Sequence, residues 1–521
     1  MGYRIFLLAL VVVAYSPTLG GDFYFDDFAL FSDPAVIRAD GPAFLLGLDR
    51  TRPLTYFTLW ANYQAGGLEP FGYHLVNVAV FVLACFLAGD LFPRLIGPRG
   101  GAIAAAIFCL HPLQTEAVGY SYGRAGVLSL LFCLVAWRLW IAGRLRGAGV
   151  VFVAAVLSKE DAVVFPVFLA GYELIFRRAS QADWQRFRGP LLAMLAVSML
   201  AGAQALLATT VVEGAGAGFA VESLSPLGYL ASQGRAILLY LRLLALPVGL
   251  NFDHDLSAAA GAAFSWIPLL LMAGGAFWFL RHKPERFWIL GALVLLAPTS
   301  SIVPLADLAA ERRMVLPLMS LSLLLGGLTT KVSGRVAGVV LAVMLSVLTF
   351  QRNQVWASPE ALWRDAAEKS PGKVRPKLQL ARALPPESAE RATLLAGARA
   401  LQPENIDVLL EFGVERLRTG DAAGALGEFD LAARIAPALS QIAANRGAAL
   451  IMLGREAEGE AAFLESLEQD PCSFDARNNL ILVRKAQGRE SEAQRLAIDA
   501  PRNCRWTEAQ LEVIRAASGP L

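Results

Sequence analysis

Long apolar runs recur through the first part of the chain, and amphipathic helices follow them. The runs begin at Tyr3, continue to about Phe350 and are long enough to cross a bilayer. From Gln351 onward the sequence is polar and charged, with apolar residues at helical spacing. We therefore expect an all-α protein with a polytopic membrane domain over residues 1–351 and a second helical domain over residues 352–521.

The positions of arginine and lysine predict the topology of the membrane domain. Short loops rich in positive charge stay on the cytoplasmic side; Arg94 and Arg138 lie in such loops, and Arg4 places the N-terminus there too. The first apolar run is expected to be a retained span, because Ser16–Gly20 lacks a signal-peptide cleavage pattern. The segment Ile237–Leu250 fits only if it lies at the interface or dips in without crossing. About eleven spans result, with the N-terminus inside and the C-terminus outside, near residues 3–20, 73–92, 100–112, 124–141, 147–158, 161–177, 190–211, 264–281, 287–304, 314–331 and 335–350.

This topology places most of the unusual polar residues on the non-cytoplasmic side. The acidic pair Asp26 and Asp27 directly follows the first span, where ionisable groups are costly to hold. Each such residue alone is compatible with a helix cap or with a side chain that reaches the lipid headgroups. As a set they indicate a site on one face: Asp26, Asp27, Arg52, His74, His111, Glu116, Arg124, Lys159, Glu160, Asp161, Asp253, Asp255, Glu311, Arg312 and Arg313.

These acids and cations suit the transfer of a sugar from a lipid-linked phosphate to a hydroxyl group. Arginine binds a phosphate through paired hydrogen bonds and lysine acts on it as a point charge. A carboxylate can accept the proton of the incoming hydroxyl. The cations then stabilise the charge that develops on the departing phosphate.

Composition excludes several other classes of function. A hydrophobic content of 56%, a charged content of 17% and a mean hydropathy of +0.50 are typical of an integral membrane protein. The net charge is +2, and no basic stripe with interleaved aromatic residues suggests a nucleic-acid partner. The sequence also lacks zinc-ligand spacing, a nucleotide-binding glycine loop and a nucleophile elbow. We therefore expect no metal and no cofactor.

An ordered series of short motifs resembles that of the transmembrane-and-TPR protein O-mannosyltransferases. Its specificity lies in the order of the motifs, since each one alone is weak. The motifs are Phe25-Asp26-Asp27, Arg52-Pro53-Leu54, Tyr73-His74-Leu75-Val76-Asn77, His111 to Val118, Gly123-Arg124, Ser158-Lys159-Glu160 through Pro166, Tyr240-Leu241 to Pro247, and Pro298-Thr299-Ser300-Ser301 to Glu311-Arg312.

The resemblance implies a glycosyltransferase of the GT-C type. Such an enzyme uses a polyprenyl-phosphate-linked sugar as co-substrate on the non-cytoplasmic side, usually without a metal. It implies that Asp26 is the catalytic base and that Asp27 helps to position the acceptor. The sugar, mannose in the family, and the acceptor, a Ser or Thr hydroxyl of an exported protein, are inherited expectations. The residues implied to contact the donor phosphate or sugar are Arg52, His74, His111, Glu116, Arg124, Lys159, Glu160 and Arg312.

The C-terminal part repeats with the 34-residue period of tetratricopeptide (TPR) units. The residues that recur at this spacing are Gly420, Gly454 and Gly488, and Pro403, Pro437 and Pro471. We expect repeats over residues 406–439, 440–473 and 474–507, with a degenerate one near 373–405. Stacked helix pairs form a concave groove that suits a polypeptide acceptor or a partner protein. A passive spacer or a dimerisation module is the alternative.

The cysteines are expected to be structural. Cys85, Cys109 and Cys133 lie inside expected spans and suit small apolar fillers. Cys472 and Cys504 flank the last repeat in a domain expected outside the cytoplasm, where a disulfide is possible.

Other functions remain open on sequence alone. A membrane-anchored TPR scaffold would need no catalytic aspartate, and a transporter or lipid flippase would show repeats among its spans. A related GT-C enzyme would glycosylate a lipid-linked glycan instead of a protein. The compact length and the Ala, Gly, Leu and Arg content favour a bacterial inner membrane, with the TPR domain in the periplasm.

Overall fold

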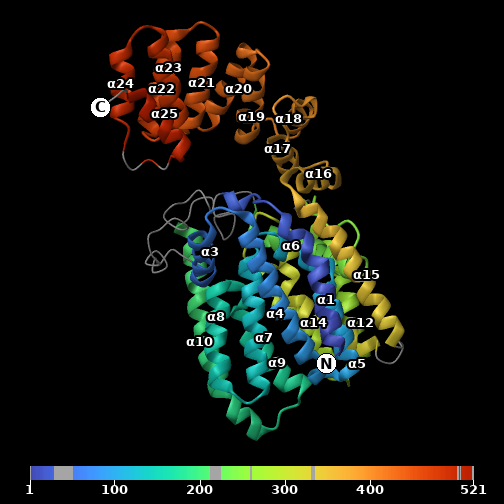
Figure 1. Ribbon diagram of the computed structural model, residues 1–521. Coiled ribbons are helices and arrows are strands. Elements are labelled where there is room, and N and C mark those ends of the chain that lie inside the picture. The colour runs from blue at the N-terminus through green and yellow to red at the C-terminus, as the bar shows by residue number, and fades with distance from the viewer. Residues whose placement is uncertain are drawn as a thin grey trace. The chain divides into compact units, whose positions relative to one another are not determined.

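The computed structural model describes residues 2–28, 51–211, 224–257, 261–329, 335–501, 504 and 506–518, and these residues form helices and connecting turns without a β-strand (Figure 1). The chain divides into two compact units, Met1–Lys369 and Ser370–Leu521. The division falls later than residue 351 because helix α16 (Pro359–Lys369) packs on unit 1. There the Lys369 ammonium donates to the carbonyl of Leu250 at 2.8 Å.

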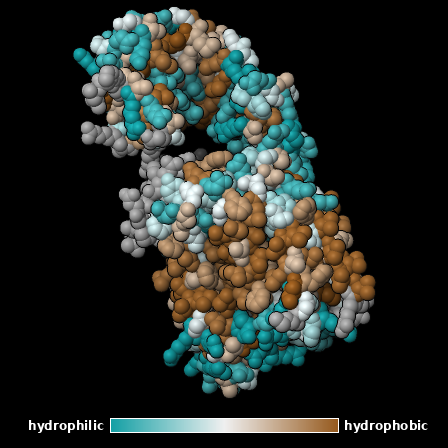
Figure 2. Space-filling view, in the orientation of Figure 1, coloured by the Kyte–Doolittle hydropathy of each residue, from teal (hydrophilic) through white to brown (hydrophobic). Residues whose placement is uncertain are grey.

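Six helical segments among the described residues are long and apolar enough to cross a membrane. In unit 1 the long helices run in roughly a common direction (Figure 1), and a broad band of hydrophobic residues crosses the face of this unit that Figure 2 shows. The all-α membrane architecture is thus confirmed. The segments are α1 (Gly2–Tyr15) with the turn η1 (Ser16–Gly20), α4 (Pro70–Ile96), α7 (Arg124–Ile141), α10 (Gln181–Val211), η6 (Ala262–Ser265) with α12 (Trp266–Phe279), and α15 (Arg335–Gln354) with η9 (Val355–Ala357).

A bent pair of helices forms a seventh candidate span. α5 (Pro98–Leu110) is followed by the turn η3 (Pro112–Gln114) and the short helix α6 (Thr115–Gly119), with a bend of 47°. His111 precedes a proline and adopts an extended backbone, as that position favours, so the helix breaks there.

Four of the eleven expected spans are shorter or broken helices. α8 (Leu145–Ser158), α13 (Arg286–Leu296) and α14 (Val315–Thr329) are each too short to count by length. The expected span 161–177 is divided into three pieces, which are η4 (Glu160–Val164), α9 (Phe165–Gly171) and η5 (Tyr172–Phe176). Hydropathy measures the apolar length of a segment, but it does not show where the helix breaks.

Two further helices complete unit 1. α3 (Pro53–Gly66) was not expected as an element and begins directly after Arg52. α11 (Pro226–Ala245) overlaps the uncertain segment Ile237–Leu250 and is not among the segments with spanning length and hydropathy.

Unit 2 is a stack of paired helices with the expected TPR spacing. Gly420, Gly454 and Gly488 have φ angles of +84°, +74° and +74°, which a residue with a Cβ adopts only with strain, and each turns the chain between two helices. The helices are α17 (Val374–Ala383), α18 (Ala389–Leu401), α19 (Ile406–Arg418), α20 (Ala422–Ile435), α21 (Ser440–Met452), α22 (Glu456–Gln469), α23 (Phe474–Ala486), α24 (Glu490–Ile498) and α25 (Glu508–Ser518).

A disulfide closes the last repeat of unit 2. Cys472 and Cys504 are bonded, with their Cα atoms 5.2 Å apart. Trp506 donates from its indole nitrogen to the carbonyl of Cys472 at 2.8 Å, and its ring packs against Phe474. These contacts hold the chain that leads into α25. Cys85, Cys109 and Cys133 are free and buried, as expected for apolar fillers.

Candidate active site

The segment after α1 turns sharply at Phe25. Its φ angle is +41°, a region that non-glycine residues rarely adopt. Aromatic packing holds this conformation, since the Phe25 ring lies against Phe252 and Trp363 at 6.5 and 6.1 Å between centroids. Tyr24 is fully buried, and its hydroxyl donates to the carbonyl of Trp356 at the end of the last span. The turn therefore fixes the aspartate that follows it.

Asp26 and Asp27 have opposite environments. Asp26 is half-buried, and its backbone amide donates to the hydroxyl of Tyr120 at 2.9 Å. Asp27 is fully buried, and its two carboxylate oxygens accept from the amides of Tyr24 and Tyr122 at 3.1 and 2.8 Å. Burial raises the pKa of Asp27 to about 8, although the amide hydrogen bonds act in the opposite direction. Only Asp26 of this pair presents an accessible carboxylate.

The loop between α6 and α7 joins the parts of this site, and of its residues only Gly123 belongs to a motif named from the sequence. Tyr120 is buried and its side chain contacts Asp26, while the Tyr122 ring lies 6.2 Å from the Tyr120 ring. Gly119 and Gly123 flank the loop. A Cβ on Gly119 would lie 3.2 Å from the Trp356 ring, and one on Gly123 would lie 2.5 Å from a backbone oxygen. Two tyrosines between two glycines in an outward loop are the sequence signal for it.

Arg312 lies near the same tyrosine. Its backbone amide donates to Glu116 at 3.0 Å and its guanidinium pairs with the same carboxylate, which is buried. A second pair joins Arg312 to Asp307 at 3.2 Å. Burial lowers the pKa of Arg312, but the charges of Glu116 and Asp307, with a smaller contribution from Tyr120, raise it above the ordinary value. Asp26, Tyr120 and Arg312 thus belong to one neighbourhood.

A second group of charges lies near Tyr122. Arg52 begins α3 with a φ angle of +64°, and its guanidinium forms a two-point pair with Glu160 and lies 5.6 Å from the Tyr122 ring. Lys159 pairs with Asp161 at 2.8 Å. Burial raises the pKa of Glu160, but the charge of Arg52 outweighs it and lowers the pKa to about 2. Both cations are partly exposed and already paired.

Three of the expected donor-binding residues are sequestered within the protein. Arg124 is fully buried and donates to the side chains of Asn77 and Asn62 at 2.7 and 2.6 Å, and to two backbone carbonyls. His74 contacts the carbonyl of Asp22 at 3.1 Å. His111 accepts from the amide of Leu113 through Nδ1 and contacts the carbonyl of Leu244 through Nε2. These contacts favour structural roles, and donor binding by these three residues stays a prediction.

Further residues of the expected outer face organise the chain around η8 (Glu311–Met314). Glu311 is buried and accepts from the amide of Asn251 at 2.6 Å and from His254 at 3.0 Å. Arg313 donates to the hydroxyl of Tyr229 at 3.2 Å. The two bonds to Glu311 hold the 251–257 segment beside the loop that carries Arg312.

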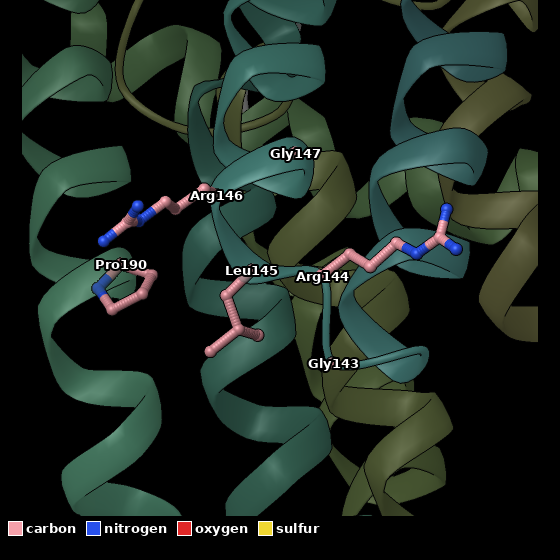
Figure 3. Close-up of a pocket in the computed structure, with 6 residues that line it drawn as sticks. All are labelled: Gly143, Arg144, Leu145, Arg146, Gly147 and Pro190. Atoms are coloured by element: carbon pink, nitrogen blue, oxygen red, sulfur yellow. The ribbon is translucent and has the colours of Figure 1, made fainter.

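The charged groups lie at one end of the unit 1 helices. Asp26 follows the end of α1, while Arg124 begins α7 and His74 is in the first turns of α4. A hollow of about 440 Å³ lies instead beyond the end of α7, lined by Gly143, Arg144, Leu145, Arg146, Gly147 and Pro190 (Figure 3). Within the described ranges, no group of three or more His, Cys, Asp or Glu side chains is placed to hold a metal ion.

The curated proteins that the chain matches include several protein O-mannosyl-transferases. No family model matches the chain. It is 25% identical over 406 residues to a protein O-mannosyl-transferase of Caenorhabditis elegans, which covers 70% of this chain and 57% of that protein. It is 35% identical over 177 residues to one of Drosophila melanogaster, covering 30% of this chain and 21% of the fly protein.

The solved structures that it matches have lower similarity. ArnT from Cupriavidus metallidurans, in a crystal structure with undecaprenyl phosphate, is 14% identical with a TM-score of 0.40, and the match covers 98% of this chain and 84% of ArnT. The chain spans little more than half the length of the worm relative and less of the fly protein. The sequence similarity confirms the resemblance that the motifs indicated: this chain is similar to protein O-mannosyl-transferases of Caenorhabditis elegans and Drosophila melanogaster.

Proposed function

We propose that the chain is a membrane glycosyltransferase that moves a sugar from a polyprenyl-phosphate-linked donor to a hydroxyl group on the non-cytoplasmic face. The sugar is mannose, as in the names of its relatives, and the acceptor is a Ser or Thr side chain of an exported protein. The observation that carries the proposal is the half-exposed carboxylate of Asp26, held by Tyr120 in the neighbourhood of Arg312.

Asp26 acts as the general base in this reaction. Its carboxylate takes the proton of the acceptor hydroxyl as the acceptor oxygen forms a bond to the anomeric carbon of the sugar. The bond between that carbon and the phosphate oxygen breaks, and its electron pair leaves with the polyprenyl phosphate. The hydrogen bond from the Asp26 amide to Tyr120 keeps the base in place during this step.

Arg312 is the cation best placed to receive the donor phosphate. It is partly exposed, and its contact with Asp307 at 3.2 Å is longer than its contacts with Glu116. If a phosphate replaces Asp307, Arg312 stays anchored on Glu116. Its guanidinium then again makes two charge-assisted contacts, one with Glu116 and one with the phosphate. Arg52 and Lys159 are further candidates, with their carboxylate partners Glu160 and Asp161 as groups that the donor must displace.

The site and the start of unit 2 belong to one side of the membrane in this proposal. The chain leaves the last span at Trp356. The carbonyl of Trp356 accepts a hydrogen bond from the hydroxyl of Tyr24, which lies two residues before Asp26. The disulfide Cys472–Cys504 is of the kind that persists in an oxidising compartment. A periplasmic TPR unit is then available to bind the acceptor polypeptide in its groove.

The test is glycan mass spectrometry of exported proteins from cells that carry the wild type or Asp26→Asn. We expect the variant to lose hexose-sized additions on Ser and Thr, because an amide cannot accept the proton. Asp22→Asn is the matched control, since it removes an exposed acid of the same segment. Hexose additions that persist unchanged in Asp26→Asn would overturn the proposal and favour the scaffold function.

A further inference from the structure

Three arginines from three helices meet one aspartate at the end of unit 1 opposite to Asp26. Arg4 lies in the first turn of α1, Asp90 and Arg94 in the last turns of α4, and Arg138 in the last turn of α7. Helices α1, α4 and α7 belong to three of the candidate spans, so the cluster lies where these three spans meet one membrane surface.

The carboxylate of Asp90 is fully engaged. Its Oδ1 accepts from Arg4 Nη2 at 2.8 Å and from Arg94 Nη2 at 2.9 Å. Its Oδ2 accepts from Arg94 Nε at 3.0 Å and from Arg138 Nε at 3.1 Å. A carboxylate offers about four lone-pair positions, so no further donor can be satisfied here.

The cluster carries an excess of positive charge. Three guanidinium groups and one carboxylate sum to +2, and within the described parts of the chain Asp90 is the sole acid in an ion pair with Arg4, Arg94 or Arg138. If the cluster were only an ion lock, that is, an ion pair that joins the helices, one cation would be enough for this acid. The two surplus charges repel each other, and the described residues provide no second acid in an ion pair with them.

The geometry leaves room for a counter-charge on the outer side of the cluster. The Arg138 side chain is 34% exposed, and neither of its Nη groups donates within the described residues. Arg4 and Arg94 are 33% and 51% exposed, whereas Asp90 is 15% exposed. Guanidinium groups suit the paired oxygens of a phosphodiester, which lies at this depth in a lipid leaflet.

The chain beyond α7 extends the positive surface. Arg144 and Arg146, both exposed, line the hollow between the start of α8 and Pro190 of α10. Figure 3 shows the Arg146 guanidinium extending toward Pro190, while Arg144 extends in the opposite direction. They raise the local positive potential without converging on one point, so the Asp90 cluster is the more specific site.

We propose that the cluster of Arg4, Arg94 and Arg138 around Asp90 binds the headgroup phosphate of an anionic phospholipid in the leaflet opposite to Asp26. The lipid supplies the missing negative charge and joins the ends of α1, α4 and α7. This site is separate from the proposed transfer reaction and does not depend on it.

Native mass spectrometry of the purified full chain tests this proposal, with phosphatidylglycerol and phosphatidylcholine of equal chain length as probes. We expect at least a fivefold preference for phosphatidylglycerol, and at least a fivefold loss of its adducts in the double variant Arg4→Gln with Arg138→Gln. Arg99→Gln is the matched control because Arg99 is exposed just beyond the end of α4. Equal phosphatidylglycerol binding in the double variant, or an equal loss in the control, would overturn the proposal.

Asp90→Asn separates lipid binding from a simple ion lock. This variant raises the charge of the cluster to +3, so we expect its melting temperature to fall in phosphatidylcholine nanodiscs and to recover when phosphatidylglycerol is added. A melting temperature that stays low with phosphatidylglycerol would mean that the cluster is only an ion lock. This measurement also covers the case in which the double arginine variant does not fold.

Discussion

At the scale of single side chains, the neighbouring residues Asp26 and Asp27 have different environments. Asp26 is partly exposed and Asp27 is buried because Phe25 turns the backbone between Tyr24 and Asp26. The sequence predicted that the pair mattered, since two acids follow a span. It could not predict which acid is accessible, because the partner of Asp27 at Tyr122 is 95 residues away.

The buried carboxylate of Asp27 gives stability a defined pH dependence. Its pKa is raised to about 8 by burial, against about 3.9 in an unfolded chain, so near neutral pH the folded state holds a proton that the unfolded state has lost. This contribution is therefore complete below pH 4 and is lost as the pH rises through 8. We expect the melting temperature of the purified protein to fall between pH 5 and pH 9, by an amount equivalent to a few kcal/mol.

Asp27→Asn removes the titrating carboxyl group and therefore tests whether Asp27 causes the pH dependence of stability. Its melting temperature should vary less with pH over the same range than that of the wild type. Parallel curves for the two proteins would assign the pH dependence to other groups. Asp22→Asn serves again as a control, since Asp22 is exposed and should leave the wild-type curve unchanged.

At the scale of helices, close approach explains why the repeat signal in the sequence was reliable. Gly447 of α21 faces the buried ring of Phe463 on α22, and a Cβ there would lie 2.6 Å from that ring. We expect Gly447→Ala to destabilise unit 2 by about 1–3 kcal/mol through overpacking. Hydrogen exchange of α21 and α22 in the full chain measures this.

The matched control lies in the preceding repeat. Gly427 is in the middle of α20, and a Cβ there meets nothing within 4 Å. Gly427→Ala should therefore leave protection unchanged or increase it by about 0.5–1 kcal/mol, from helix propensity alone. If both substitutions lowered protection equally, the close packing of helix pairs would not be the reason for glycine at position 447.

The membrane helices were harder to predict than the repeats for a related reason. A repeat is fixed by contacts between neighbouring helices, so its spacing is visible along the sequence. The break at His111 and the three pieces between Glu160 and Phe176 depend on proline positions and on distant partners. Arg124, for example, binds Asn77 and Asn62, which are 47 and 62 residues away. Its burial could not be derived from its place at a helix end.

For the whole molecule, the two ends of the spans carry different groups. Arg4, Arg94 and Arg138 were expected on one side from their positive charge, and the structure brings them together on Asp90. Trp356, at the end of the last span, contacts Tyr24 at the other end. The last span therefore ends on the side of Asp26, and the proposal that this side is non-cytoplasmic rests on the positive-inside rule.

The disulfide provides the test of that assignment, because its two thiols would stay reduced in a cytoplasm. The chain has five cysteines, of which Cys85, Cys109 and Cys133 are free. Free thiols are blocked when the cells are lysed and the protein is denatured, and the disulfide is reduced afterwards. We expect about three blocking groups to bind before reduction, and two maleimide tags to bind to the thiols that reduction releases. The double variant Cys472→Ser with Cys504→Ser should gain none on reduction.

The same double variant should lose about 2–4 kcal/mol of stability in unit 2, since it frees the chain that leads into α25. Five accessible thiols in the unreduced wild type would place unit 2 in a reducing compartment. Asp26 would then face the cytoplasm with it, and transfer onto exported proteins at this site would be excluded.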